Sequence, residues 1–460
     1  MKKDQLIFII ATLLVMGSSF WYAYRIASSP ELNDYIGDEV WYVPASRNIL
    51  NELGLHTHYT NEEGMVGISI IFANESLETR YVSFADYEAI ANGGKAFRYN
   101  EIPGSYYEIP RENEKSFLSS ISKRIPSDSY RVVTGYRYPD KENIHNYLNL
   151  EHPFLGKDFI MAGMLIEDKP LYWRLPGLIA FLAVQALVLL TTWRITKSYL
   201  ASLIALVFTA ADPTLQATAV AAMLDIYVAL GTALFMALLV HDRIEASGIA
   251  LGLAASAKLS GAFAWPVLLC KSLKGERSLP RLLLAVSVLP AIGFFVPNIP
   301  AVAAVGMERW LREFLGSFKW HLSYKGPNPN TSPFWEWFIN YRPFPFHFNP
   351  NIFAETDPFL LISTVVFLFA LPWLYRRHKK ILEVYGIFWS TVGFFALQYV
   401  LGGKTQFSFY ATVLVPPAAV VMGVALKELL KWEAFSESLR LYWGWMKEAK
   451  NWILWRLGKA

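Results

Sequence analysis

The sequence predicts an α-helical membrane protein with several transmembrane helices. Of its 460 residues, 54 % are hydrophobic and only 17 % are charged, and the mean hydropathy is positive. An average soluble domain has about 25 % charged residues, whereas a membrane-spanning helix needs a run of about 20 apolar residues. The 31 Phe, 24 Tyr and 16 Trp suit a protein with many helix ends at membrane interfaces.

The charge argues against a nucleic-acid partner, and the cysteine content excludes a disulfide and a cysteine-based metal site. A net charge of +4 is small, and the Lys and Arg residues fall mainly in short loops, so a nucleic acid is not an expected partner. The single cysteine, Cys270, excludes an intramolecular disulfide and a metal site built from several cysteines. We expect a buried, unreactive side chain at this position.

Apolar runs predict about ten transmembrane helices, some of them short. The first, within residues 1–27, is either a signal peptide or an anchor. Its length and aromatic end favour an uncleaved anchor, whereas Ala27-Ser28-Ser29 would allow cleavage. Helices 2–7 are expected in 172–304 and helices 8–10 in 358–430. Their predicted spans lie near 173–193, 199–211, 214–240, 247–258, 260–273, 280–304, 358–375, 381–402 and 407–426.

The distribution of basic residues predicts the orientation of these helices. Clusters such as Lys2-Lys3, Arg194/Lys197 and Arg376 to Lys380 fall on one side of this arrangement, which is therefore cytoplasmic, as are both termini. The long polar segments 28–171 and 305–357 become outer loops. The tail, residues 431–460, alternates Trp and Leu with charged residues, which predicts an amphipathic helix on the cytoplasmic surface.

The first outer loop contains features of its own. Alternating runs at Val66–Phe72, Arg80–Phe84 and Ser129–Tyr138 predict β-strands in a small α/β insert spanning about 64–138. The stretch 153–168 has an apolar face but is too short to cross a bilayer. An interfacial helix is expected there.

Two adjacent carboxylates, Asp38 and Glu39, follow the first predicted helix, with aromatic residues on both sides. Acidic residues so close to a bilayer lie where a lipid-borne substrate presents its polar head. Two solvated loop carboxylates are the simpler interpretation of such a pair in isolation. We predict that Asp38 is the catalytic base of an enzyme acting at the outer membrane face.

Several short stretches, in this order, resemble the protein O-mannosyltransferases of the GT-C glycosyltransferase superfamily. They are Gly37-Asp38-Glu39, Glu151-His152-Pro153-Phe154-Leu155-Gly156-Lys157, Trp173-Arg174-Leu175-Pro176-Gly177, Asp212-Pro213, Met223-Leu224-Asp225-Ile226, Ala257-Lys258-Leu259-Ser260-Gly261 and Ser332-Pro333-Phe334-Trp335-Glu336-Trp337. The resemblance covers most of the chain outside the 64–138 insert and the tail. It implies a GT-C fold, with two large outer loops.

The resemblance also implies a reaction: inverting transfer of mannose from a dolichyl or other polyprenyl phosphate to a Ser or Thr hydroxyl of a protein. Asp38 matches the position of the family's catalytic acid, and Glu39 would orient the acceptor or hold Asp38. An alcohol is a poor nucleophile at neutral pH and needs a base, whereas a phosphate leaves readily and needs only cations or donors around it. We expect the cell membrane of a prokaryote, with the active site facing outward.

Further residues are candidates for the substrate or phosphate site, each with a structural alternative. Lys258 interrupts an apolar stretch and either extends to the interface or meets an anion. Lys157 and Arg174 either bind phosphate or anchor the interface. The remaining candidates on the outer face are His152, which could instead form a structural hydrogen bond, Asp225, which could be only a charge at a helix N-terminus, and Lys404.

The match has gaps that affect the site. Relatives often carry an Arg shortly before the Leu-Asp pair, but residues 217–222 contain no cation. Phe154 replaces the second proline of the family's His-Pro-Pro. A divalent metal such as Mg²⁺ or Mn²⁺ is possible, but the sequence assigns no metal ligands, because no Asp-x-Asp occurs.

Other interpretations stay open. Another GT-C transferase, such as an aminoarabinose transferase acting on a lipid or glycan, would use the same carrier chemistry. An oligosaccharyltransferase is disfavoured because its Trp-Trp-Asp signature is absent. A transporter of lipid-linked sugars should show repeats and midplane charges, and an inactive subunit would lack the acid pair. The sugar, the acceptor, the carrier length and the oligomeric state are not determined by the sequence.

Overall fold

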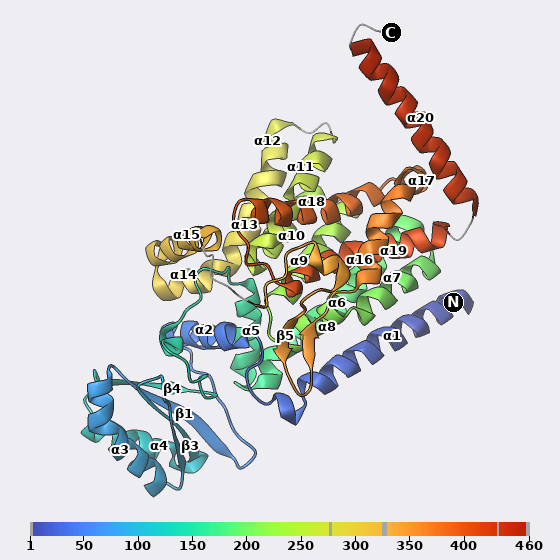
Figure 1. The fold of residues 1–460 in the computed structure, drawn as a ribbon. Coiled ribbons are helices and arrows are strands. Elements are labelled where there is room, and N and C mark those ends of the chain that lie inside the picture. Colours follow the sequence, from blue (N-terminus) through green and yellow to red (C-terminus); the bar gives the residue numbers. More distant parts are fainter. Residues whose placement is uncertain (1–2, 276–277, 324–328, 430–431, 457–460) are drawn as a thin grey trace.

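The computed structural model describes residues 3–275, 278–323, 329–429 and 432–456. Residues 324–328 of the predicted second outer loop, and residues 431 and 457–460 of the predicted tail, lie outside these ranges. A helical bundle carries a small α/β lobe at one end, and a long C-terminal helix, α20 (Trp432–Arg456), projects from the other (Figure 1).

Six helices in the described residues are long and apolar enough to cross a membrane. They are Lys3–Ala27 (α1), Pro170–Thr196 (α6), Leu279–Val305, Pro358–Arg377, Ile381–Val400 (α18) and Ser408–Leu429. Three of these spans contain shorter helices. The third contains α12 (Leu279–Leu283), α13 (Leu289–Phe295) and α14 (Ile299–Val305), the fourth contains α16 (Pro358–Val366) and α17 (Leu371–Arg377), and the last contains α19 (Val415–Leu429). The chain is therefore a multi-pass membrane protein.

The remaining apolar helices are bent or short. Tyr199–Ala211 (α7) and Pro213–Val220 (α8) form one candidate span that bends by 54°. Three shorter apolar helices are Asp225–Val240 (α9), Ile244–Ala257 (α10) and Leu259–Leu273, which ends with α11 (Trp265–Leu273). The predicted single helix over 214–240 is wrong, because the chain breaks after Val220 and the N–H of Ala222 donates to a Glu39 carboxylate oxygen at 2.8 Å.

Small residues allow the bundle helices to approach closely. A Cβ atom added to Gly252 of α10 would lie 2.1 Å from the carbonyl oxygen of Pro290 in α13, and one added to Gly423 of α19 would lie 2.5 Å from that of Ala201 in α7. Such contacts supply packing where lipid removes the hydrophobic drive between helices. They place α10 and α19 in the interior of the bundle, whereas α1 is largely exposed along its length.

The α/β lobe consists of one antiparallel sheet and two helices. The sheet order is β2-β3-β1-β4, formed by Lys95–Arg98, Gly104–Pro110, Met65–Phe72 and Tyr130–Thr134. Helices α3 (Glu75–Ala91) and α4 (Glu114–Arg124) cover one face, where they bury Ile68, Ile70 and Tyr107. The strand predicted at Arg80–Phe84 is instead part of α3, because the Asn74 side chain caps this helix by accepting from the N–H of Leu77 at 3.0 Å.

Further elements lie outside the lobe and outside the candidate spans: α2 (Glu39–Glu52), α5 (Leu155–Ile166), α15 (Met307–Ser323) and the hairpin of β5 (Phe344–His347) and β6 (Ile352–Ala354). Helix α5 occupies the stretch for which an interfacial helix was predicted. The Arg47 guanidinium of α2 forms a fully buried ion pair with Asp168, with N–O distances of 2.6 and 2.9 Å. This pair fixes α2 against the start of α6.

Candidate active site

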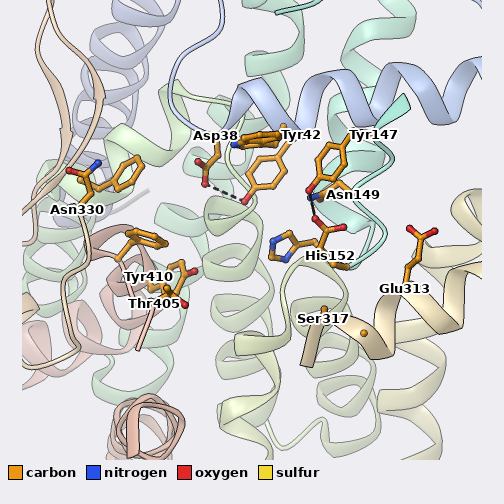
Figure 2. A pocket seen from close by; sticks show the side chains of 15 residues that line it. Asp38, Tyr42, Tyr147, Asn149, His152, Glu313, Ser317, Asn330, Thr405 and Tyr410 are labelled. Atoms are coloured by element: carbon orange, nitrogen blue, oxygen red, sulfur yellow. Dashed lines mark hydrogen bonds between the residues drawn. The ribbon is translucent and has the colours of Figure 1, made fainter. Parts of the chain in front are cut away.

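A cavity of about 750 Å³ opens at the start of α2, and Asp38 lies in its wall (Figure 2). Residues from six chain segments meet there: the start of α2, the loop before α5, helix α15, the loop that contains Asn330, strand β5 and the segment after α18. The lining residues are Asp38, Trp41, Tyr42, Tyr147, Asn149, Glu151, His152, Glu313, Gly316, Ser317, Asn330, Phe344, Thr405, Phe407 and Tyr410. A cavity of this size can hold a sugar phosphate headgroup together with part of an acceptor.

A tight turn presents Asp38 to the cavity. Gly37 has a φ of +51°, and a Cβ atom there would lie 2.6 Å from the Phe346 ring. Its N–H donates to the Phe346 carbonyl of β5 at 3.0 Å, so the turn is fixed to the hairpin. Glycine is favoured at such a position because other residues rarely adopt positive φ.

The surroundings of Asp38 make its carboxylate more basic. Asp38 is half-buried, and the Tyr42 hydroxyl, one helical turn further along α2, donates to it at 3.5 Å. Burial raises the pKa of Asp38 to about 6, while the nearby Lys258 ammonium opposes this rise and Asp225 adds to it. Asp38 is therefore ionised at neutral pH, yet it is more basic than an ordinary aspartate.

Glu39 points away from the cavity and is fully buried. Its carboxylate forms a two-pronged ion pair with Arg174 of α6, with both N–O distances 2.7 Å. It also accepts the N–H of Ile36 at 2.9 Å and that of Ala222 at 2.8 Å. Glu39 thus ties the Asp38 turn to α6 and to the break between α8 and α9.

Arg174 does not line the cavity either. Its guanidinium donates to Glu39 and to the backbone carbonyls of Leu32, at 2.7 Å, and Asp34, at 2.6 Å, with a longer contact to Ala27 at 3.4 Å. All five of its N–H groups are occupied by these partners. The geometry therefore gives Arg174 a structural role in holding the loop after α1.

Asp225 and Lys258 form an ion pair beside the cavity. The Lys258 Nζ lies 3.0 and 3.2 Å from the two Asp225 carboxylate oxygens, and both residues are largely buried. The same ammonium lies 3.7 Å from the centroid of the Tyr410 ring, which lines the cavity. Lys258 is thus part of the electrostatic environment of Asp38, separated from the cavity by an aromatic wall.

Lys157 lies behind the loop before α5, which forms another wall of the cavity. Its buried ammonium donates to the carbonyl oxygens of Asn149 and His152 and, at 2.9 Å, to the Asn149 side chain. Burial lowers the pKa of Lys157 to about 7. The loop that it holds presents His152 edge-on to the Tyr42 ring, with 6.0 Å between the centroids, and presents Glu151, which accepts from Tyr147.

The remaining wall and rim come from residues far along the chain. Helix α15 contributes Glu313 and Ser317, and Thr405 lines the side next to Tyr410 (Figure 2). Lys404 is exposed, with its Nζ 5.8 Å from the Tyr399 ring centroid, and does not line the cavity. In the part of the chain that the structure describes, the lining holds three carboxylates and no Lys or Arg.

The residues present do not form a recognisable metal site. Among the described residues, no group of three or more His, Cys, Asp and Glu side chains is arranged to hold a metal ion. A divalent ion usually takes several oxygen ligands, but Asp225 is paired with Lys258 and Asp38 is bonded to Tyr42. A role for Mg²⁺ or Mn²⁺ stays a prediction.

Neither a protein-family model nor a curated protein sequence matches this chain. Two solved structures have a similar fold over most of it. ArnT from Cupriavidus metallidurans bound to undecaprenyl phosphate is 16 % identical, with a TM-score of 0.48, over 94 % of this chain and 62 % of that one. The oligosaccharyltransferase AglB from Archaeoglobus fulgidus, in complex with an inhibitory peptide and a dolichol-phosphate, is 11 % identical, with a TM-score of 0.41, over 94 % of this chain and 54 % of that one.

This chain therefore spans less than two thirds of the length of either structure. Both identities and both TM-scores are low, so the functional argument has to rest on the residues of the cavity.

Several lining residues were not predicted from the sequence. Tyr42 carried a signal, because it follows Asp38 by four residues and so lies on the same face of a helix. Glu151 stood within a quoted motif. Tyr410 and Phe407 belong to an aromatic stretch whose location against Lys258 depends on tertiary packing, which no local pattern reveals.

Proposed function

We propose that this chain is a membrane glycosyltransferase of the GT-C type, moving a sugar from a polyprenyl phosphate to an acceptor hydroxyl. The observation that carries the proposal is the half-buried Asp38, with a pKa of about 6, in a large cavity next to apolar helices. A carboxylate of this kind suits proton abstraction from an alcohol at neutral pH. The apolar helices beside the cavity suit a donor with a lipid tail.

In the proposed reaction, Asp38 takes the proton of the acceptor hydroxyl as its oxygen attacks the anomeric carbon. The new C–O bond forms on the face opposite the phosphate, the bond to the phosphate oxygen breaks, and the lipid phosphate leaves with the bonding electrons. The configuration at the anomeric carbon is inverted. Because a phosphate leaves without protonation, one base is sufficient.

Charge on the departing phosphate has to be balanced by cations or hydrogen-bond donors. We infer that Lys258 contributes to this balance through its electrostatic field, from behind the Tyr410 ring and without lining the cavity. Lys404 would act at the outer rim, next to Thr405. Asp225 would keep Lys258 protonated and oriented, and His152 would contact the sugar or the phosphate.

The finer proposal is transfer of mannose from a dolichyl-type phosphate to Ser or Thr residues of proteins on the outer membrane face. It is supported by the motifs that run from Gly37 to Trp337 in the order found in protein O-mannosyltransferases. Both termini would be cytoplasmic, and the membrane would be that of a prokaryotic cell.

A second candidate is transfer of an amino sugar, as in an aminoarabinose transferase, to a lipid or glycan. The described lining contains Asp38, Glu151 and Glu313 but no Lys or Arg, and such a cavity stabilises a cationic amino group better than it does a neutral sugar.

The deciding experiment supplies purified protein with radiolabelled dolichyl-phosphate-mannose and a peptide rich in Ser and Thr, beside the Asp38→Asn variant. Labelled peptide with wild type, and its loss in the variant, would support the finer proposal. Hydrolysis of the donor or transfer to added lipid, without labelled peptide, would retain the glycosyltransferase and overturn the acceptor. Equal activity of the variant would overturn the role of Asp38.

A further inference from the structure

A second cavity, of about 390 Å³, lies between the α/β lobe and the segment that leads into Asp38. The residues that line it are Asp34, Tyr35, Val40, Phe97, Arg98, Tyr99, Tyr106, Arg137, Tyr138, Pro139 and Asp140. Asp34, Tyr35 and Val40 flank Asp38 in the chain, and the next residues, Trp41 and Tyr42, line the first cavity. One short segment therefore forms part of the wall of both cavities.

The charged groups in this lining are already compensated. Arg137 pairs with Asp34, and the Nε of Arg98 lies 2.8 Å from an Asp86 carboxylate oxygen. Asp140 accepts two backbone N–H groups from the turn after β2, at 2.7 and 2.9 Å. What the cavity offers a ligand is therefore mostly aromatic surface, which suits an uncharged ligand.

The lobe side of this cavity reaches the free edge of a strand. Strand β2 stands first in the sheet order and pairs only with β3 in the described sheet. Phe97 of β2 and its cross-strand partner Tyr106 of β3 both line the cavity, so the cavity lies against their face of the sheet, beside the edge strand. The Phe97 side chain is 47 % exposed. An open edge beside an aromatic surface is suited to the addition of an extended peptide.

We propose that an extended, uncharged segment of the acceptor polypeptide binds in this cavity by adding a strand to β2 and packing an apolar side chain on Phe97. The bound chain then follows the segment from Asp34 to Val40 toward Asp38. This inference rests on the proposed function in taking a protein as the acceptor, and it deepens that function by assigning acceptor binding to the lobe. Backbone hydrogen bonds supply affinity that depends little on the peptide sequence.

The test measures peptide binding separately from transfer. Asp38→Asn protein in lipid nanodiscs is titrated against a fluorescent, uncharged peptide containing Ser and Thr, and against the same peptide N-methylated at alternate residues. Phe97→Ala is compared with Tyr87→Ala, a matched control because Tyr87 is exposed on α3 of the same lobe and does not line the cavity. We expect N-methylation and Phe97→Ala each to raise Kd about tenfold or more and Tyr87→Ala to leave it unchanged.

Absence of peptide binding, equal binding of the N-methylated peptide, or binding that does not depend on Phe97 would overturn the inference. Binding of a neutral oligosaccharide in place of the peptide, sensitive to Phe97→Ala, would overturn it as well. The two proposals fail in different ways. Peptide binding without transfer by the wild type contradicts the proposed function alone, whereas transfer to peptide with an unchanged acceptor KM in Phe97→Ala contradicts the lobe site alone.

Discussion

At the scale of single residues, the character of Asp38 depends on its partial burial. Its pKa of about 6 means that the carboxylate becomes protonated within the range where enzymes are assayed. A base must be ionised to accept a proton, so kcat/KM should fall about tenfold per pH unit below pH 6 and level off above it. An ordinary aspartate would keep the profile flat down to about pH 4. A pH profile of sugar transfer checks this expectation.

The Asp38→Asn variant should lose about 10²- to 10⁴-fold in kcat, the usual contribution of a general base. The folded-state pKa lies above that of an unfolded aspartate, so stability is lost as the pH rises from about 4 through about 6. Asparagine does not ionise, so the variant does not lose this stability as the pH rises. Thermal unfolding at pH 7 should therefore show a variant at least as stable as the wild type, and a less stable variant would mean that the activity loss reflects misfolding.

Tyr42 should tune this base without being essential. Its hydroxyl donates to Asp38 at 3.5 Å and so favours the ionised carboxylate, although the bond is long and weak. In Tyr42→Phe, we expect the acidic limb of the pH profile to move upward by less than about one unit, with most of the kcat retained. Tyr87→Phe on the lobe provides the control. A shift to lower pH would contradict the hydrogen bond.

At the scale of secondary-structure elements, the ion pair between Glu39 of α2 and Arg174 of α6 holds the Asp38 turn in place. Glu39 and Arg174 are both fully buried, and removal of one partner leaves an uncompensated charge. Glu39→Gln or Arg174→Met should each cost about 3–5 kcal/mol in the free energy of unfolding. Denaturation in detergent measures this cost.

Two comparisons separate the buried pair from ion pairs in general. Glu63→Gln removes a partner of Lys95 from a pair with exposed side chains and should cost less than about 1 kcal/mol. The double variant Glu39→Gln/Arg174→Met should be more stable than the sum of the single changes predicts. If Glu39→Gln and Arg174→Met lowered the free energy of unfolding as little as Glu63→Gln does, the Glu39–Arg174 pair would not be a determinant of the fold.

At the scale of the whole molecule, the arrangement predicts which parts face which side of the membrane. Cys270 was predicted to be buried, but it is exposed, so it is replaced by serine first. In this Cys270→Ser background, Tyr87→Cys on the lobe should react with a membrane-impermeant maleimide in intact cells. Trp443→Cys on α20 should react only after the cells are permeabilised. Both positions are exposed, so no other described part of the chain covers them. The opposite pattern would reverse the orientation of the chain.

Hydropathy was sufficient to predict the long helices, because lipid requires apolar side chains over the whole length of a span. It could not predict the break at 221–224, since the sequence remains apolar there and the backbone turns to meet Glu39. The strand expected at Arg80–Phe84 became helical because an Asn cap and helical burial of Val82, Ala85 and Ala89 prevailed over local alternation.

The candidate site was predictable only in part. Asp38 could be found from its position, and it does line the cavity. Sequence reasoning gave Arg174 and Lys157 possible phosphate roles, since a cation in a motif does not reveal whether its donors are already occupied. The fully buried pair of Arg47 and Asp168 was also missed, because its members are far apart in the chain.

The carboxylate of Glu39 has a consequence for biosynthesis. It holds together three regions that leave the ribosome at different times: the turn around Ile36, the start of α6 at Arg174 and the break at Ala222. While the chain is being made, Glu39 can pair with Arg174 once α6 is present, but its bond to Ala222 forms only after the chain has passed that break. A nascent chain halted earlier carries Asp38 without this support for its turn, so under the proposed function we expect sugar transfer to require insertion of the centre of the bundle.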